Sequence, residues 1–367
     1  MPRRFDVLDS FRGLAAILVV VVHMHYVGSF IEPEFFRESF LFVEFFFVLS
    51  GFVLAHGYAL KKDLNFKTFI ISRSFRLFPL HLFTLTIIVL LEFGKLYAYN
   101  KGFSFNAIPF TNTQNPHDII PSALLLQAWL PNVETFGWNS PSWSISIEFY
   151  MYLLFFVSLF IKRPYLFIVW SILSIIAFIT IIMKQDTPIG ELAIARGFSS
   201  FFAGGLIYFL FRKIYPIVTL GKNLFTILEL IVIALVILTI SSSIPYKSLV
   251  ATALFIIQIF IFAFQKGYIS NFFRSNVFLY LGKLSYSIYL THTIIIFGSL
   301  STYMIIEKFL RIKTSQTIDG QRFIDLGSPL YNNLAILAVL GTVIFVSHFT
   351  YKYIELKGQA IGKKLSQ

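Results

Sequence analysis

The sequence predicts an all-α polytopic membrane protein, a bundle of about ten transmembrane helices with both termini in the cytoplasm. Hydrophobic residues make up 57% of the 367 residues and charged residues only 13%, whereas about a quarter of an ordinary soluble domain is charged. Apolar runs near the length that crosses a bilayer recur along the chain. Lysine and arginine are roughly twice as frequent in the connections on the N-terminal side of these runs as on the other side.

The expected spans follow one another without a change in composition or an internal repeat. We therefore predict one domain over residues 1–367, with no soluble hydrolase-like domain appended. The expected spans are 5–26, 40–58, 77–93, 142–161, 165–183, 192–211, 224–242, 249–264, 277–300 and 330–349.

The composition also excludes several classes of protein. Cytoplasmic anchors such as Arg3, Arg4 and the basic segment 61–76 account for the net charge of +12, so no nucleic-acid partner is expected. The chain has no cysteine, which rules out disulfides and cysteine-ligated metal, and it has no metal-ligand spacing or phosphate-binding loop. The first apolar run carries charges and lacks a cleavage pattern, so we expect a multi-pass protein of the inner (plasma) membrane.

The first span, 5–26, carries ionisable residues on one side. At about 100° per residue, Asp9, Arg12 and His23 share a stripe, and His25 points to the other face. Buried ionisable groups normally face a bundle interior or a wet cavity. The stripe is either a functional site or an Asp9–Arg12 pair at the headgroups, with His23 satisfied by a neighbouring helix. The spacing alone leaves both interpretations open.

Two arginines precede the third span. Arg73 and Arg76 lie one helical turn apart, and Pro79 is expected in the first turn of that span. Guanidinium groups match phosphate oxygens bidentately, so the pair is a candidate phosphate clamp. The alternative is a pair of cytoplasmic anchors.

Two further polar residues lie within apolar spans. Glu148 lies one to two turns into the fourth span, where a carboxylate needs either a structural partner or a role in acid–base chemistry. His292 lies in the ninth span and is interpreted as a helix-packing group or a functional residue. The Ser50–Gly51 step in the second span predicts close helix packing.

Together these segments resemble the acyltransferase-3 family of bacterial integral-membrane O-acyltransferases, over nearly the whole chain. The first helix matches the family's pattern with Asp9, Arg12 and His23. Five further blocks occur in the family's order, at 46–52 (FFVLSGF), 73–79 (RSFRLFP), 125–131 (LLQAWLP), 143–148 (WSISIE) and 284–292 (LSYSIYLTH). The end of the last helix departs from the family's pattern, because Glu355 is followed by Leu and Lys without a proline.

The resemblance implies transfer of an acyl group, usually acetyl, from acyl-CoA to a hydroxyl of a cell-surface or lipid-linked carbohydrate. It makes His23 the essential histidine with Arg12 as its partner, and Arg73 and Arg76 the arginine pair that serves the donor. A histidine suits this reaction as a general base or as an acylated nucleophile, and the sequence leaves both open. Glu148 is a candidate for acid–base work.

Two alternatives remain at this stage. One is acyl transfer to a small molecule such as a macrolide. The other is a secondary transporter or flippase that binds a polar solute at the stripe, although the internal repeats and broken helices of many transporters are not evident. The sequence predicts neither the acceptor nor the oligomeric state.

Overall fold

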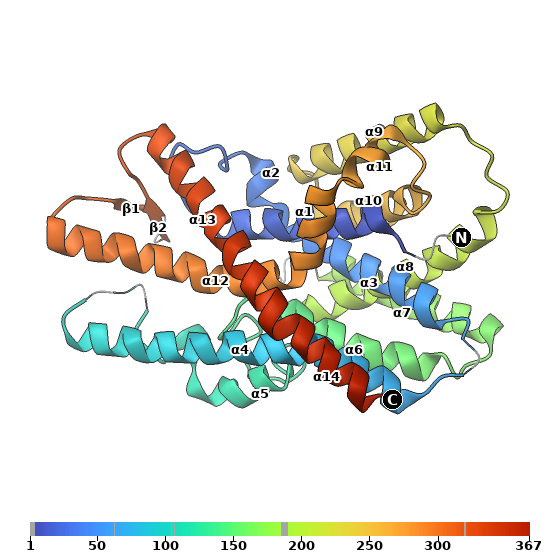
Figure 1. Ribbon diagram of the computed structural model, residues 1–367, viewed down its shortest axis with the longest axis horizontal. Coiled ribbons are helices and arrows are strands. Elements are labelled where there is room, and N and C mark those ends of the chain that lie inside the picture. The colour runs from blue at the N-terminus through green and yellow to red at the C-terminus, as the bar shows by residue number, and fades with distance from the viewer. Residues whose placement is uncertain (1–3, 62, 104, 106, 185–189, 319–320) are drawn as a thin grey trace.

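The computed structural model describes residues 4–61, 63–103, 105, 107–184, 190–318 and 321–367, and most of them are helical (Figure 1). Arg3 and Lys62, two of the expected cytoplasmic cations, lie outside the described residues. The elements are α1 (Asp6–Val22), α2 (Glu34–Arg37), η1 (Ser39–Leu41), α3 (Phe42–Tyr58), α4 (Phe66–Asn100), η2 (Asn112–Gln114), η3 (Pro116–Asp118), α5 (Ile119–Ala123), α6 (Ser142–Ser158), α7 (Arg163–Met183), α8 (Ala193–Ile214), α9 (Lys222–Ile240), α10 (Lys247–Phe262), α11 (Tyr268–Phe273), α12 (Asn276–Leu310), β1 (Ser315–Ile318), β2 (Gln321–Ile324), α13 (Pro329–Thr350), the π-helical η4 (Tyr351–Glu355) and α14 (Leu356–Leu365).

The helices are those of a polytopic membrane protein. Among the described residues, seven helical segments are long and apolar enough to cross a membrane, and they contain α3, α4, α7, α8, α9, α12 and the continuous run from α13 to α14. Helices α6 and α10 are apolar but shorter, and α1 carries three charged residues within 17. Each of the ten expected spans falls on a helix. Both termini lie toward the right of Figure 1, whereas the β1–β2 hairpin lies at the left.

Small residues let the central helices approach closely. A Cβ at Gly13 of α1 would lie 2.6 Å from the backbone nitrogen of Gly282 on α12, so these backbones touch. A Cβ at Gly51 of α3 would lie 1.8 Å from the carbonyl oxygen of Phe201 on α8. The close packing predicted for the Ser50–Gly51 step is confirmed.

The start of the third span differs from the prediction. Helix α4 begins at Phe66, where the Asn65 side chain accepts a hydrogen bond from the backbone nitrogen of Thr68. Pro79 therefore lies inside the helix, and its predicted place in the first turn is wrong. Its ring contacts Gly358 of α14, where a Cβ would lie 2.5 Å from the Pro79 side chain. The basic segment is thus largely helical and holds its arginines on a rigid element.

The segment 301–329 between the last two expected spans also contains regular structure. Helix α12 continues to Leu310, and the antiparallel strands β1 and β2 follow it. Strand β2 is fixed to the segment after α1, because the nitrogen of Ile324 donates to the oxygen of His25 and its oxygen accepts from Val27. The hairpin therefore lies over the C-terminal end of α1.

Candidate active site

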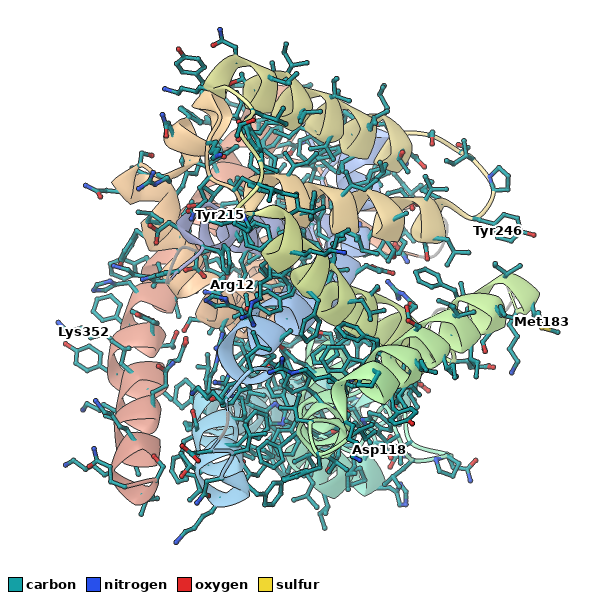
Figure 2. The ribbon with its side chains drawn as sticks, turned by 90° about the vertical axis from the view of Figure 1, so that its right-hand side faces the viewer. Arg12, Asp118, Met183, Tyr215, Tyr246 and Lys352 are labelled. Atoms are coloured by element: carbon teal, nitrogen blue, oxygen red, sulfur yellow. The ribbon has the colours of Figure 1, made fainter. Side chains whose placement is uncertain are left out.

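The charged residues at the start of α1 point into the bundle. Arg12 pairs with Asp9 at 3.1 Å, and it donates hydrogen bonds to the Ser285 hydroxyl at 2.9 Å and the Gly282 carbonyl at 3.1 Å. Figure 2, which views the bundle from one end, places Arg12 among the helices and away from the outer edge. Asp9 also pairs with Arg4 at 2.8 Å. The Arg12 side chain is therefore held against α12 and faces the other helices.

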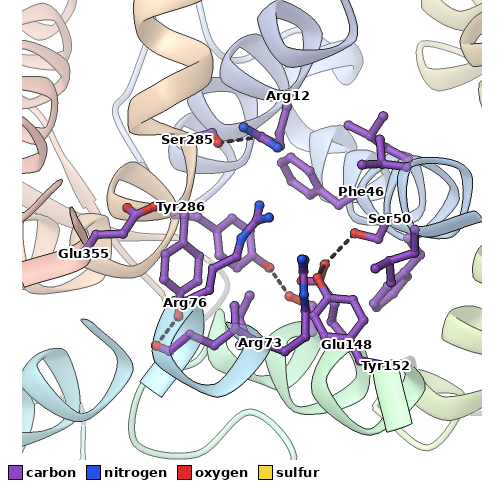
Figure 3. A pocket seen from close by; sticks show the side chains of 18 of the residues that line it. Arg12, Phe46, Ser50, Arg73, Arg76, Glu148, Tyr152, Ser285, Tyr286 and Glu355 are labelled. Carbon is purple, nitrogen blue, oxygen red and sulfur yellow. Dashed lines mark hydrogen bonds between the residues drawn. The ribbon is translucent and has the colours of Figure 1, made fainter. Parts of the chain in front are cut away.

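Arg12 lines a cavity of about 110 Å³ that several distant segments enclose. Figure 3 shows Arg12 entering from one side and Arg73 and Arg76 of α4 from the other. A cavity of this size is smaller than the pockets that enclose a drug-sized ligand, so it suits a thin part of a larger molecule. The charged lining residues are the cations Arg12, Arg73, Arg76 and Lys283 and the carboxylates Glu148 and Glu355.

The two arginines of α4 differ in their contacts. Arg73 donates to the hydroxyl of Tyr58 at 3.2 Å and lies against the rings of Tyr58, Phe69 and Tyr152. Arg76 makes no hydrogen bond or ion pair with any described residue. Its guanidinium is therefore available to a ligand, whereas Arg73 is held in place by aromatic rings.

Glu148 has structural partners and still lines the cavity. Its Oε1 accepts a hydrogen bond from the Ser50 hydroxyl at 2.5 Å and another from the hydroxyl of Tyr152 one turn further along α6. Proximity to two α4 arginines offsets the cost of this charge inside the bundle. Both interpretations of Glu148 therefore remain compatible with its position.

Glu355 is a cavity residue that the sequence argument did not select. It is 5% exposed, and it accepts hydrogen bonds from Ser287 at 3.0 Å and Gln359 at 3.2 Å. The only signal in the sequence is an acidic residue at the end of the last apolar segment, where the missing proline departs from the family's pattern. With Glu355 included, four cations face two carboxylates, so the cavity favours an anionic ligand.

His23 lies apart from this cavity, at the end of α1. It is the C-cap of the helix, roughly 16 Å from Arg12 at 1.5 Å rise per residue. Its Nδ1 lies 2.8 Å from the Val19 carbonyl. When Nδ1 carries the proton and donates it to that carbonyl, the lone pair of Nε2 is free.

His292 of α12 is the neighbour of His23. The two ring centroids are 4.9 Å apart. His292 is fully buried, its Nδ1 lies 3.2 Å from the Ile288 carbonyl, and its Nε2 has no hydrogen-bond partner among the described residues. A buried nitrogen without a hydrogen-bond partner is uncommon and needs an explanation. Because the His292 ring contacts the His23 ring, we consider the two histidines together as one candidate site.

Comparisons with known proteins identify the family of the chain. A family model described as an acyltransferase domain matches residues 5–351. The chain belongs to the acyltransferase-3 family. It is similar to Acyltransferase MdmB of Streptomyces mycarofaciens, with 34% identity over 166 residues that cover 42% of this chain and 40% of that relative. It is also similar to Protein 2 in picA locus of Rhizobium radiobacter, with 35% identity over 138 residues, 31% of this chain and 70% of that relative. No solved structure matches the chain.

The family motifs of this acyltransferase-3 protein thus form two groups in space. Arg12, Arg73, Arg76 and Glu148 line one cavity, and His23 lies outside it. Asp9 does not line the cavity, and its ion pair with Arg12 connects it to this site.

One side chain of α12 lies between the two groups. Tyr289 lines the cavity, and its ring centroid is 6.1 Å from that of His292. Its hydroxyl lies 2.8 Å from the Ser144 hydroxyl, and its ring packs on Phe46 at 5.6 Å. Tyr289 and His292 therefore form a chain of contacts from the cavity to His23.

His25 lies on another face, as the helical spacing predicts. Its ring packs on Phe323 of β2 at 5.2 Å. It lines small hollows at the end of α1 and does not line the cavity around Arg12.

Proposed function

We propose that this protein is a membrane O-acyltransferase that moves an acyl group, most simply acetyl, from acyl-CoA to a hydroxyl of a cell-surface or lipid-linked carbohydrate. Membership of the acyltransferase-3 family supports acyl transfer. The observation that carries the choice of donor is the convergence of Arg12, Arg73, Arg76 and Lys283 on one narrow cavity inside an apolar bundle.

The cavity suits a phosphorylated donor with a thin arm. CoA carries several phosphate groups, and a free guanidinium such as Arg76 binds a phosphate through two parallel hydrogen bonds. Arg73, which packs against aromatic rings, adds a second positive charge about one helical turn away on α4. The small volume admits the arm of acyl-CoA and leaves the nucleotide at the mouth. We place this mouth on the cytoplasmic side, where acyl-CoA is made.

His23 supplies the proton chemistry of the proposed reaction. Its free Nε2 removes the proton of the acceptor hydroxyl as the oxygen attacks the thioester carbonyl. The carbon–sulfur bond then breaks, and the CoA thiolate takes the proton from the His23 imidazolium. The products are the acyl ester and CoA. The same lone pair suits a route through an acyl-histidine intermediate. Rapid quenching of the enzyme with labelled donor distinguishes the two routes, because only the acyl-histidine route leaves label on the protein.

The other candidate residues support the donor in this proposal. Arg12, fixed by Asp9 and Ser285, stabilises negative charge on the donor inside the bundle. Glu148 holds Tyr152 and Ser50 in place and limits the positive charge of the cavity. We assign no proton transfer to Glu148, because its carboxylate already accepts two hydrogen bonds.

The test is transfer of a radiolabelled acetyl group from acetyl-CoA to surface polysaccharide taken from cells that lack this protein. Purified protein in detergent should label the polysaccharide, and Arg76→Ala should raise KM for acetyl-CoA by about tenfold, the loss expected for a charged hydrogen bond. Arg212→Ala, which removes an exposed arginine at the end of α8, is the matched control. Labelling that is absent from the wild type, or an unchanged KM in Arg76→Ala, would contradict the proposal.

A further inference from the structure

A second hollow lies at the opposite end of α1 from Asp9, beyond His23. The segment after α1, helix α2 and strand β2 enclose about 250 Å³ there. We call it the outer hollow. Its lining mixes aromatic, charged and amide side chains, namely Tyr26, Glu32, Phe36, Arg37, Gln321 and Phe323. Such a mixture, with a few polar groups among aromatic walls, is typical of a site that orients a small polar ligand.

Two exposed polar side chains that line the outer hollow have no side-chain partner among the described residues. Arg37 forms no ion pair or hydrogen bond with a described residue, although Glu34 and Glu38 lie within one turn. Both glutamates face Lys247 instead, at 3.3 and 3.4 Å. The side-chain amide of Gln321 likewise makes no hydrogen bond with a described residue. The hollow therefore presents donors and an acceptor that a ligand can use.

The outer hollow adjoins a second hollow that contains His23. A narrower hollow of about 20 Å³ contains His23, and Met24, His25 and Tyr26 line both hollows. The segment from Met24 to Tyr26 is thus a shared wall, and His23 lies directly behind it. The cavity around Arg12 shares no lining residue with either hollow. A molecule in the outer hollow therefore approaches His23 from the side opposite the donor.

We infer that the outer hollow binds one sugar unit of the acceptor and directs its hydroxyl toward Nε2 of His23. This inference rests on the proposed function and adds the residues that select the acceptor. A sugar ring has an apolar face that packs on Phe323 or Phe36, and its hydroxyl groups donate to Gln321 and accept from Arg37 and Gln321. A large apolar acceptor would leave these polar groups desolvated without partners, which is unfavourable.

The β1–β2 hairpin gains a role from this inference. Its backbone bonds to His25 and Val27 hold Gln321 and Phe323 at a fixed place over the end of α1. Acceptor specificity would then depend on a short segment outside the helical bundle, which is free to vary without disturbing the donor cavity.

The experiment measures KM for each substrate separately. The probe is surface polysaccharide from cells that lack the protein, with labelled acetyl-CoA as donor. The variants are Arg37→Ala, Gln321→Ala and the double variant. Lys313→Ala, which removes an exposed cation that lies just before the hairpin and outside the hollow, is the matched control.

We expect KM for the polysaccharide to rise about tenfold in Arg37→Ala, the loss for a hydrogen bond to a charged group, while KM for acetyl-CoA stays within about twofold. Arg37→Lys should recover part of this loss.

The outcomes separate the two proposals. If the wild-type protein is active and the double variant has an unchanged KM for the polysaccharide, the proposed acceptor site is refuted and the proposed acyltransferase function stands. Inactive wild-type protein would contradict the proposed function and, with it, this inference. If a variant fails to fold, Gln321→Cys gives a second measurement, because the chain has no other cysteine. Polysaccharide should slow maleimide labelling of that cysteine, and an unchanged labelling rate would refute binding in the outer hollow.

Discussion

Replacing His23 by alanine tests the assignment of the base most directly. Among the described residues, Nε2 of His23 has no hydrogen-bond partner, and Nδ1 fixes the ring through the Val19 carbonyl. A positioned general base contributes about 10²–10⁴ to a rate, which is roughly 3–5 kcal/mol of the activation barrier. His23→Ala should therefore lower kcat for acetyl transfer by about 10²–10⁴ and leave KM for acetyl-CoA within about twofold, because His23 does not line the donor cavity.

The same substitution should leave the fold intact. It removes one side-chain hydrogen bond at the end of α1, worth about 1 kcal/mol, whereas α1 remains packed on α12 through Gly13 and Gly282. Transfer of labelled acetyl to surface polysaccharide is the assay, and the thermal midpoint of the purified protein checks folding. His25→Ala is the control, since His25 faces the hairpin, and its kcat should fall by less than about tenfold. A kcat for His23→Ala within tenfold of wild type, or equal losses in both variants, would refute the reasoning.

Three further outcomes follow from the structure. His292→Gln should lower kcat by about tenfold, equivalent to about 1.4 kcal/mol. Both KM values should stay unchanged, because His292 contacts His23 and lines neither the cavity around Arg12 nor the outer hollow. A raised KM for either substrate would contradict a positioning role. Gly51→Ala should destabilise the protein by about 1–3 kcal/mol through overpacking, measured as a lower thermal midpoint, whereas Gly57→Ala on the same helix has nothing within 4 Å of the new Cβ and is the control. A cysteine at Lys101 should react with an impermeant maleimide in intact cells, and one at Lys61 only after lysis; the reverse pattern would overturn the orientation.

The helical spans and the charged stripe of α1 were predictable because helix phase is regular. Arg12 and His23 are eleven positions apart, and this spacing places them on the same side of the helix; the structure shows that both contact α12. The Ser50–Gly51 step was predictable for a similar reason, since a glycine in an apolar helix indicates a close neighbour. These features depend on local geometry, which one sequence contains.

Features that depend on distant partners were not predictable in this way. Glu355 enters the cavity because α13 continues through η4 into α14 and passes beside α4. Arg196 is buried in a pair with Glu44 at 2.6 Å, although 152 positions separate the two residues. The sequence around Glu355 and around Arg196 does not indicate which distant residues they contact. Helical spacing therefore could not predict either contact.

The position of Tyr289 bears on how the donor reaches His23 in the proposed reaction. Its ring, packed on Phe46, lies between the donor cavity and His292, and its hydroxyl is bonded to Ser144. Moving this side chain breaks one neutral hydrogen bond, at a net cost of about 0.5–1.5 kcal/mol. This cost is close to thermal energy, so Tyr289 is a side chain that the acyl arm of a bound donor can displace. On the proposed mechanism the thioester therefore passes Tyr289 and His292 to reach His23, and these two side chains separate His23 from the donor cavity while no donor is bound.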